Sequence, residues 1–247
     1  MDISLPKSWH ELSQRQLKQV YKTISTGLPS LDARLALAIR WSPLRPTRRF
    51  STFKICGTDD KGKKKTEILS LSPEDLHSLA DALSWIDTLP LTPSRPDKIG
   101  GAYALSPLLY EIDFETFLSL DNLFQGYKSK NDPALLDRMF RVMYPHRLFL
   151  IPIPSLSKDF RRTVVIYWFA ALKHAFARLF PSFLQPSSDN RRQAAGPMES
   201  VNAMLRALTK GDITKEEEVR RMPCHRALTE LDALARESEE LRRRLKK

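Results

Sequence analysis

The residues that could carry chemistry are five histidines, two cysteines and one run of three glutamates. The histidines have no shared context and no metal-ligand spacing; they are His10, His77, His146, His174 and His225. Cys224 and His225 are adjacent, and neighbours on a helix do not face each other, so we do not expect a nucleophile–base pair. Glu216, Glu217 and Glu218 fall in the first turn of an expected helix, where acids complement the helix dipole.

No other catalytic or cofactor motif is present. The eight glycines are scattered and form no phosphate-binding loop. There is no HExxH motif, and the serine-rich pieces lack the strand–turn–helix context of a nucleophile elbow. We therefore expect a protein that is not an enzyme, with no catalytic residues, no metal site and no cofactor.

Basic residues give a first candidate binding site. The net charge of +11 is compatible with nucleic acid, acidic proteins or a membrane surface as partner, and equally with simple solubility. The expected nucleic-acid contacts lie in one loop and at one hairpin tip; they are Arg45, Arg48, Arg49, Lys61, Lys63, Lys64 and Lys65. The lysines could contact phosphates or keep the tip solvated and resistant to edge pairing; we favour the second interpretation.

A leucine seam in the last fifty residues gives a second candidate. The expected final helix carries Leu228, Leu231, Leu234 and Leu241 on one narrow face, while its outer face alternates Glu and Arg. The seam could pack onto the protein's own helices or bind a partner helix, and both interpretations remain open. The three glutamates of the preceding helix argue against helix–turn–helix binding to DNA, because phosphates should lie there.

Capping signals and helical periodicity run through most of the chain and predict the elements that position these residues. Ser13 and Gln16 form a capping box, and Gly27 ends that helix. Further expected helices begin at Ser30, at Ser72-Pro73, at Asp113, at Asp132-Pro133 and at Ser157. The helix after Asp113 is expected to end near Gly126, and the most apolar one, from Ser157 to Phe180, should be central.

The fold class predicted is mainly α: a helical bundle with one small β-hairpin and a C-terminal helical arm. Alternation over Phe50–Cys56 and Thr66–Leu71 predicts the hairpin. We expect a helical domain over 1–184 with the hairpin inserted near 50–71, a linker over 185–197, and the arm over 198–247. A subdomain boundary is placed in the Pro- and Gly-rich stretch 89–101. Within the arm, Thr214 and Glu217 should form a capping box.

From the sequence we expect neither a targeting segment nor a membrane span. Its first residues lack the basic start and apolar core of a signal peptide. The longest apolar run, Val164 to Leu172, is far too short for a membrane span. We expect a cytoplasmic protein with two free thiols and no membrane partner.

Four segments carry a family resemblance: LPKSWHELSQRQLKQVY, NDPALLDRMFRVMYP, IYWFAALKHAFARLFPSF and LTKGDITKEEEVRRMPCHRALTELDALARESEE. Together they resemble a group of prophage proteins from gut Bacteroidales. The closing scheme, a short helix broken at Met222-Pro223 and followed by an Ala/Leu/Glu helix, also resembles the tail-assembly chaperones of long-tailed phages. Those are small, non-catalytic helical proteins that bind the tape-measure protein before the tail polymerises.

The resemblance implies a non-enzymatic phage morphogenesis protein in the cytoplasm of a bacterial host, with a helical partner such as the tape-measure protein. The chain departs from the simpler chaperones in its length and in its basic hairpin. Two alternatives remain. One is a nucleic-acid-binding accessory protein that uses the basic loop and hairpin; the other is a structural component of the virion.

Overall fold

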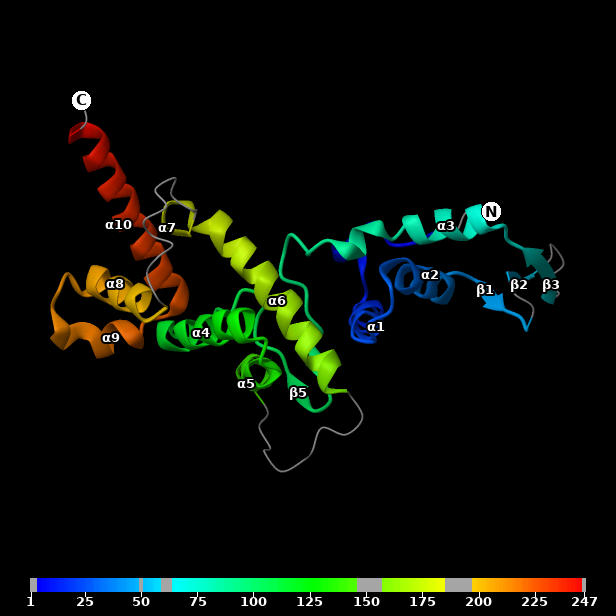
Figure 1. The fold of residues 1–247 in the computed structure, drawn as a ribbon, viewed down its shortest axis with the longest axis horizontal. Helices are drawn as coiled ribbons and strands as arrows, with labels where there is room; N and C mark the ends of the chain where they lie inside the picture. The colour runs from blue at the N-terminus through cyan, green and yellow to red at the C-terminus, as the bar shows by residue number, and fades with distance from the viewer. Residues whose placement is uncertain (1–3, 49–50, 59–63, 146–156, 185–196, 246–247) are drawn as a thin grey trace. The chain divides into compact units, whose positions relative to one another are not determined.

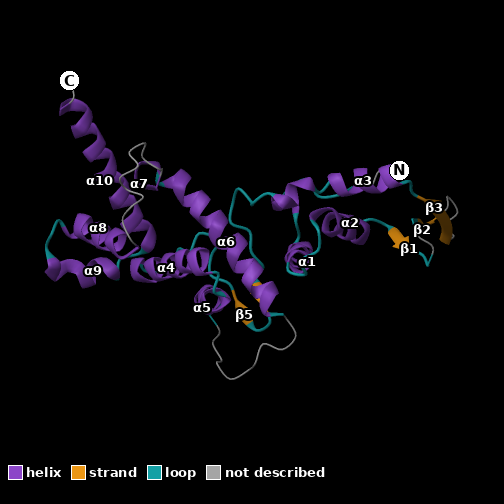
Figure 2. Ribbon diagram, in the orientation of Figure 1, coloured by secondary structure: helices purple, strands orange, loops and turns teal. Residues whose placement is uncertain are grey.

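The computed structural model describes residues 4–48, 51–58, 64–145, 157–184 and 197–245 (Figure 1). Helices make up most of it, and strands are confined to short segments (Figure 2), which confirms the mainly α fold class. The chain divides into two compact units, 1–90 and 91–247. The division falls at the edge of the stretch 89–101 where the sequence places a boundary. No helix among the described residues is both long and apolar enough to cross a membrane.

Three helices and an aromatic cluster build the first unit. The helices are α1 (Gln14–Ile24), α2 (Ser30–Trp41) and α3 (Pro73–Asp81), with the short 3-10 helices η1 (Trp9–Glu11) and η2 (Ser84–Asp87). The capping boxes at Ser13 and Ser72 both form, as predicted. Ser30, however, does not cap α2: its hydroxyl donates to Asp87 instead, because the helix already begins at Ser30 after Pro29.

The core of this unit is centred on Trp9. Its ring lies 5.9 Å from that of Tyr21 and 5.6 Å from that of Trp85, so η1, α1 and η2 meet there. Both indole N–H groups are satisfied by backbone carbonyls, Trp9 by Thr88 and Trp85 by Pro6, each at 3.0 Å. Large rings with satisfied polar edges stabilise a core without leaving a buried donor unpaired.

The predicted hairpin forms, and a third strand joins it. β2 (Thr52–Thr58) pairs antiparallel with β3 (Lys64–Ser70), and β1 (Leu44–Pro46) pairs with the start of β2. The strand β1 was not expected, because Pro43 and Pro46 favour a loop. Pro46 is tolerated because β1 is an edge strand of the sheet, where a missing N–H leaves no neighbour unsatisfied.

The second unit is organised around α6 (Lys158–Leu179), which packs on α5 (Pro133–Met143) and carries the longest run of buried side chains. Its expected central place is therefore confirmed. Arg162 on α6 holds the Asp137 carboxylate on α5 with two nitrogens, at 3.1 and 2.7 Å. Trp168 is fully buried, and its indole N–H donates to the Pro107 carbonyl at 2.8 Å.

The helix α4 (Phe114–Lys130) begins at the predicted cap, Asp113, but does not end near Gly126. It continues for another turn and ends at Asn131, whose φ of 52° is left-handed. Gly126 serves packing instead of termination. A Cβ added there would lie 3.1 Å from Leu135 Cδ1, so the glycine lets α4 and α5 approach closely.

A second, two-stranded hairpin lies in the stretch where the sequence predicts only loop. β4 (Lys98–Ile99) pairs with β5 (Ala102–Tyr103). The buried Tyr144 hydroxyl donates to the Pro96 carbonyl at 2.7 Å, which ties the end of α5 to the start of this hairpin. The hairpin is too short to give a periodic signal in the sequence.

The last described segment, 197–245, is an integral part of the second unit. It contains α8 (Pro197–Thr209), η4 (Ile213–Lys215), α9 (Glu216–Arg220) and α10 (Cys224–Leu245), while α7 (Pro181–Leu184) precedes it. α8 packs on α4, and α10 packs on α4, α7 and α8. The prediction of a capping box at Thr214 and Glu217 is wrong. Asp212 caps η4 instead, because its side chain accepts a hydrogen bond from the backbone N–H of Thr214. The expected linker lies, apart from residue 197, outside the described residues.

Candidate functional site

A short antiparallel bridge fixes the start of α10 to the start of α4. The N–H of Phe114 donates to the Met222 carbonyl at 2.8 Å, and the N–H of Cys224 donates to the Ile112 carbonyl at 3.1 Å. Pro223 makes this possible, since it ends α9 and leaves an extended residue between two helices. The proline break thus works as a docking point that sets the direction of α10.

His225 holds the first turn of α10 in an aromatic cage. Its Nε2 lies 2.8 Å from the Leu108 carbonyl, and its ring stacks on Tyr110 at 4.2 Å between centroids. The ring of Phe176 meets it edge-on at 5.2 Å. The ring is therefore packed against aromatic side chains and one nitrogen is engaged by a carbonyl, which explains this histidine structurally.

Asp232, two turns further along, positions α7. Its Oδ1 accepts hydrogen bonds from the backbone N–H groups of Ser182 and Phe183, at 2.7 and 3.1 Å. Free N–H groups at a helix start need such an acceptor. The Asp232 side chain thereby caps α7 and holds Phe183 beside α10.

An apolar groove of about 540 Å³ opens between α7, α8 and α10. Its walls are mainly small or flexible apolar side chains: Phe183 of α7, Ala203, Met204 and Ala207 of α8, and Leu234 and Ala235 of α10. Ala203 and Ala207 are exposed, one turn apart on the same face. The opposite side of α8 buries Val201 and Leu205 in the unit. One side of α8 thus belongs to the core and the other to the groove.

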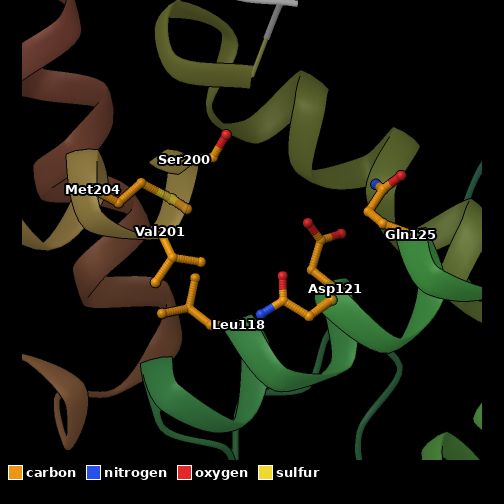
Figure 3. Close-up of a pocket in the computed structure, with 7 residues that line it drawn as sticks. Leu118, Asp121, Gln125, Ser200, Val201 and Met204 are labelled. Carbon is orange, nitrogen blue, oxygen red and sulfur yellow. The ribbon is translucent and has the colours of Figure 1, made fainter. Parts of the chain in front are cut away.

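A smaller, more polar hollow of about 250 Å³ lies between α8 and α4 (Figure 3) and shares Met204 with the groove. Asp121, Asn122 and Gln125 of α4 line it together with Ser200 and Met204 of α8. Lys173 neutralises the Asp121 carboxylate at 2.7 Å. Neither a histidine nor a cysteine is among the residues that line the hollow.

The predicted partner-binding leucines divide into two groups. Leu228 and Leu231 are 0% and 3% exposed, so they belong to the core of the second unit. Leu234 is half-buried and lines the groove. Leu241 is 60% exposed, and every residue of α10 from Arg236 onward is exposed. Only the second half of the seam is therefore open to a partner.

The predicted nucleic-acid contacts are placed only in part. Arg45 lies in β1 and Arg48 follows it, and both are exposed. Lys64 and Lys65 open β3 and are paired in register with Thr58 and Gly57. Arg49, Lys61 and Lys63 lie outside the described residues.

The geometry around Cys224 offers no activated thiol. Its side chain is buried, and burial, with a smaller contribution from the Asp113 charge, raises the pKa of the thiol to about 12. A thiol with that pKa stays protonated and is a poor nucleophile at neutral pH. Among the described residues, no three His, Cys, Asp or Glu side chains come together as a metal site.

Sequence reasoning missed the groove because its walls come from three helices. The sequence did contain one signal for it. Ala203 and Ala207 put small residues on one side of α8, and Val201 and Leu205 put the core residues on the other. The roles of His225 and Asp232 had no sequence signal, since their acceptor and donors lie 117 and 50 residues away. A scan against protein-family models found no match for this chain, and searches of curated proteins and of solved structures found none either.

Proposed function

We propose that this protein is a non-enzymatic assembly factor that binds a helical segment of a partner protein. The observation that carries the proposal is the groove between α7, α8 and α10 together with the exposed continuation of α10. A groove next to an exposed amphipathic helix is the arrangement by which proteins receive a partner helix.

The groove has the right lining for a helix. Ala203, Ala207 and Ala235 are small, so a partner backbone can approach closely between α8 and α10. Met204 and Leu234 supply apolar contact, and methionine adapts its shape to different partner side chains. The polar groups Glu199 and Ser238 also line the groove, where they can fix the register of the bound segment.

The end of α10 extends this surface. Ten residues from Arg236 to Leu245 are exposed, about 15 Å of helix. Leu241 and Leu245 are 60% and 87% exposed and lie on the same face, one turn apart. Glutamates at 237, 239 and 240 and arginines at 242–244 flank them, so an oppositely patterned partner helix gains charge complementarity.

The finer proposal is a phage morphogenesis role like that of tail-assembly chaperones, with the tape-measure protein as the partner. Four sequence segments that resemble prophage proteins support it. The order of elements over 216–245, a short helix, a proline break and a longer helix, also supports it, because tail-assembly chaperones end in a similar way. A tape-measure protein is expected to be largely helical, so it would supply a helical segment for the apolar groove.

Co-purification of the full chain with the tape-measure product of the same prophage tests this proposal. Ala203→Glu places a charge in the groove, and we expect it to weaken binding at least tenfold, since an unpaired charge at an interface costs about 2 kcal/mol or more. Asn202→Glu is the matched control: it is the neighbouring exposed residue, makes the same charge change and does not line the groove. Equal binding by both variants would remove the groove from the proposal.

The protein content of purified phage particles distinguishes a chaperone from a structural component. An assembly factor leaves before the tail is complete, so the protein should be absent from particles in quantitative mass spectrometry. A fixed copy number in particles would replace the chaperone role with the structural one.

A further inference from the structure

The open face of the three-stranded sheet carries positive charge, and none of the described strand residues on it is an acid. Opposite residues of an antiparallel pair lie on the same face, and the register places Arg45, Lys54 and Ile68 side by side. Arg45 and Lys54 are exposed, and Ile68 is 70% exposed. The other face buries Leu44 and Phe53. The sheet therefore has one core face and one cationic face.

Within the described strands, acidic residues are kept off this face. Glu67 is the single acid within the three strands, and it is paired with Ile55, in the set of residues on the opposite face. Among the described residues, no ion pair involves Arg45, Arg48 or Lys54. The Arg45 guanidinium makes only long contacts, 3.4 and 3.3 Å, to the carbonyls of Ser42 and Leu44. These cations are available to an anionic partner.

The surrounding sequence strengthens the charge. Residues 40–65 contain nine basic and two acidic side chains. The face also presents hydroxyl groups, including the exposed Ser70. Arginine, lysine and hydroxyl side chains are the groups that contact phosphates in nucleic-acid complexes. Ile68 is the single large apolar side chain exposed on the described face, too little for the apolar core of a protein interface.

We propose that this face, through Arg45 and Lys54, binds the phosphate backbone of duplex DNA without sequence selection. No exposed aromatic side chain lies on the described strands, whereas proteins that hold single strands stack bases on aromatic rings. β2 and β3 continue beyond β1 as a two-stranded ribbon, pairing residues 56–58 with 64–66. A ribbon of this kind enters the major groove of DNA, while that of duplex RNA is too deep and narrow. The site is separate from the groove on the second unit.

Fluorescence anisotropy of the full chain with a labelled 24-base-pair duplex, titrated at several salt concentrations, tests the proposal. We expect Arg45→Glu with Lys54→Glu to weaken binding about tenfold or more at low salt, and the neutral pair Arg45→Gln with Lys54→Gln to lower the salt slope by about two. The matched control is Lys18→Glu with Lys22→Glu, which makes the same charge change on exposed positions of α1 in the same unit. Circular dichroism checks that each variant is folded.

Three results would overturn the assignment. An equal loss in the control pair means that net charge, not the sheet face, drives binding. Tighter binding of a single strand or of duplex RNA of the same length excludes duplex DNA as the occupant. Competition by polyglutamate at equal charge concentration indicates an acidic protein partner instead. The proposal is supported if unlabelled duplex DNA competes for binding and the other competitors do not. It also requires that Arg45→Glu with Lys54→Glu weakens binding while the control pair does not.

Discussion

The Asp232 carboxylate of α10 accepts a hydrogen bond from the backbone N–H of Ser182 at 2.7 Å, and this bond attaches α7, one wall of the groove, to α10. The same oxygen also accepts from Phe183, so one side chain satisfies two donors at the start of α7. This acceptor couples the folding of α7, which forms one wall of the groove, to the folding of α10.

Replacing Asp232 by alanine should loosen α7 and lower stability by about 1–2 kcal/mol, the usual effect of losing a helix cap. Asp232→Asn keeps one oxygen acceptor and should lose less. Hydrogen exchange of peptides from 158–184, followed by mass spectrometry, measures the change. Glu230→Ala, exposed on the same helix, is the control. Unchanged protection in Asp232→Ala would mean that other contacts hold α7.

His225 should prove structural, with its hydrogen bond and its ring contributing separately. His225→Phe keeps the stacking but leaves the Leu108 carbonyl unpaired, so we expect a loss of about 1–2 kcal/mol. His225→Ala also loses the contacts with Tyr110 and Phe176, and the loss should rise to about 2–4 kcal/mol. Exchange protection of α10 amides reports both values.

Arg226→Ala, the exposed neighbour, serves as the control for both variants. If His225→Phe proves as damaging as His225→Ala, the hydrogen bond alone holds the first turn of α10, and the aromatic cage contributes nothing measurable.

Local signals were sufficient for most helices but not for their partners. The capping boxes at Ser13 and Ser72, the caps at Asp113 and Asp132, and the apolar helix at 158–179 depend on neighbours within four residues. Gly126 misled because glycine ends some helices and lets others approach closely, and only the position of Leu135 distinguishes the two cases.

The candidate site depended on contacts that the sequence does not encode locally. The leucine seam was visible in the periodicity, yet burial of Leu228 and Leu231 depends on α10 docking onto other helices. The bridge between Asp113 and Pro223 joins residues 110 positions apart. The strand β1 likewise forms only because β2 supplies its hydrogen bonds.

The buried Cys224 thiol should make stability fall at high pH. Its folded pKa is raised from 9.0 to about 12, so the unfolded chain loses this proton first as pH rises. The contribution is fully present below pH 9 and is lost progressively between pH 9 and 12, at a limiting slope of about 1.4 kcal/mol per pH unit. The difference in stability between the wild type and Cys224→Ala, measured by urea unfolding from pH 7 to 10.5, isolates it. A difference that stays constant with pH would show that the thiol titrates normally.

The contact between Gly126 and Leu135 sets how close α4 and α5 can lie, and a double-mutant cycle can measure it. Alanine in a helix interior is about 1 kcal/mol better than glycine. A Cβ at position 126 would press on Leu135, so Gly126→Ala should gain less than this in the wild type. In the Leu135→Ala background the obstruction is gone, and the full gain should appear. Gly126→Val adds bulk that the side chain of Leu135 cannot avoid, and should destabilise the protein by about 1–3 kcal/mol. Equal gains from Gly126→Ala in both backgrounds would mean that Leu135 moves aside freely and that the glycine does not control the approach of the two helices.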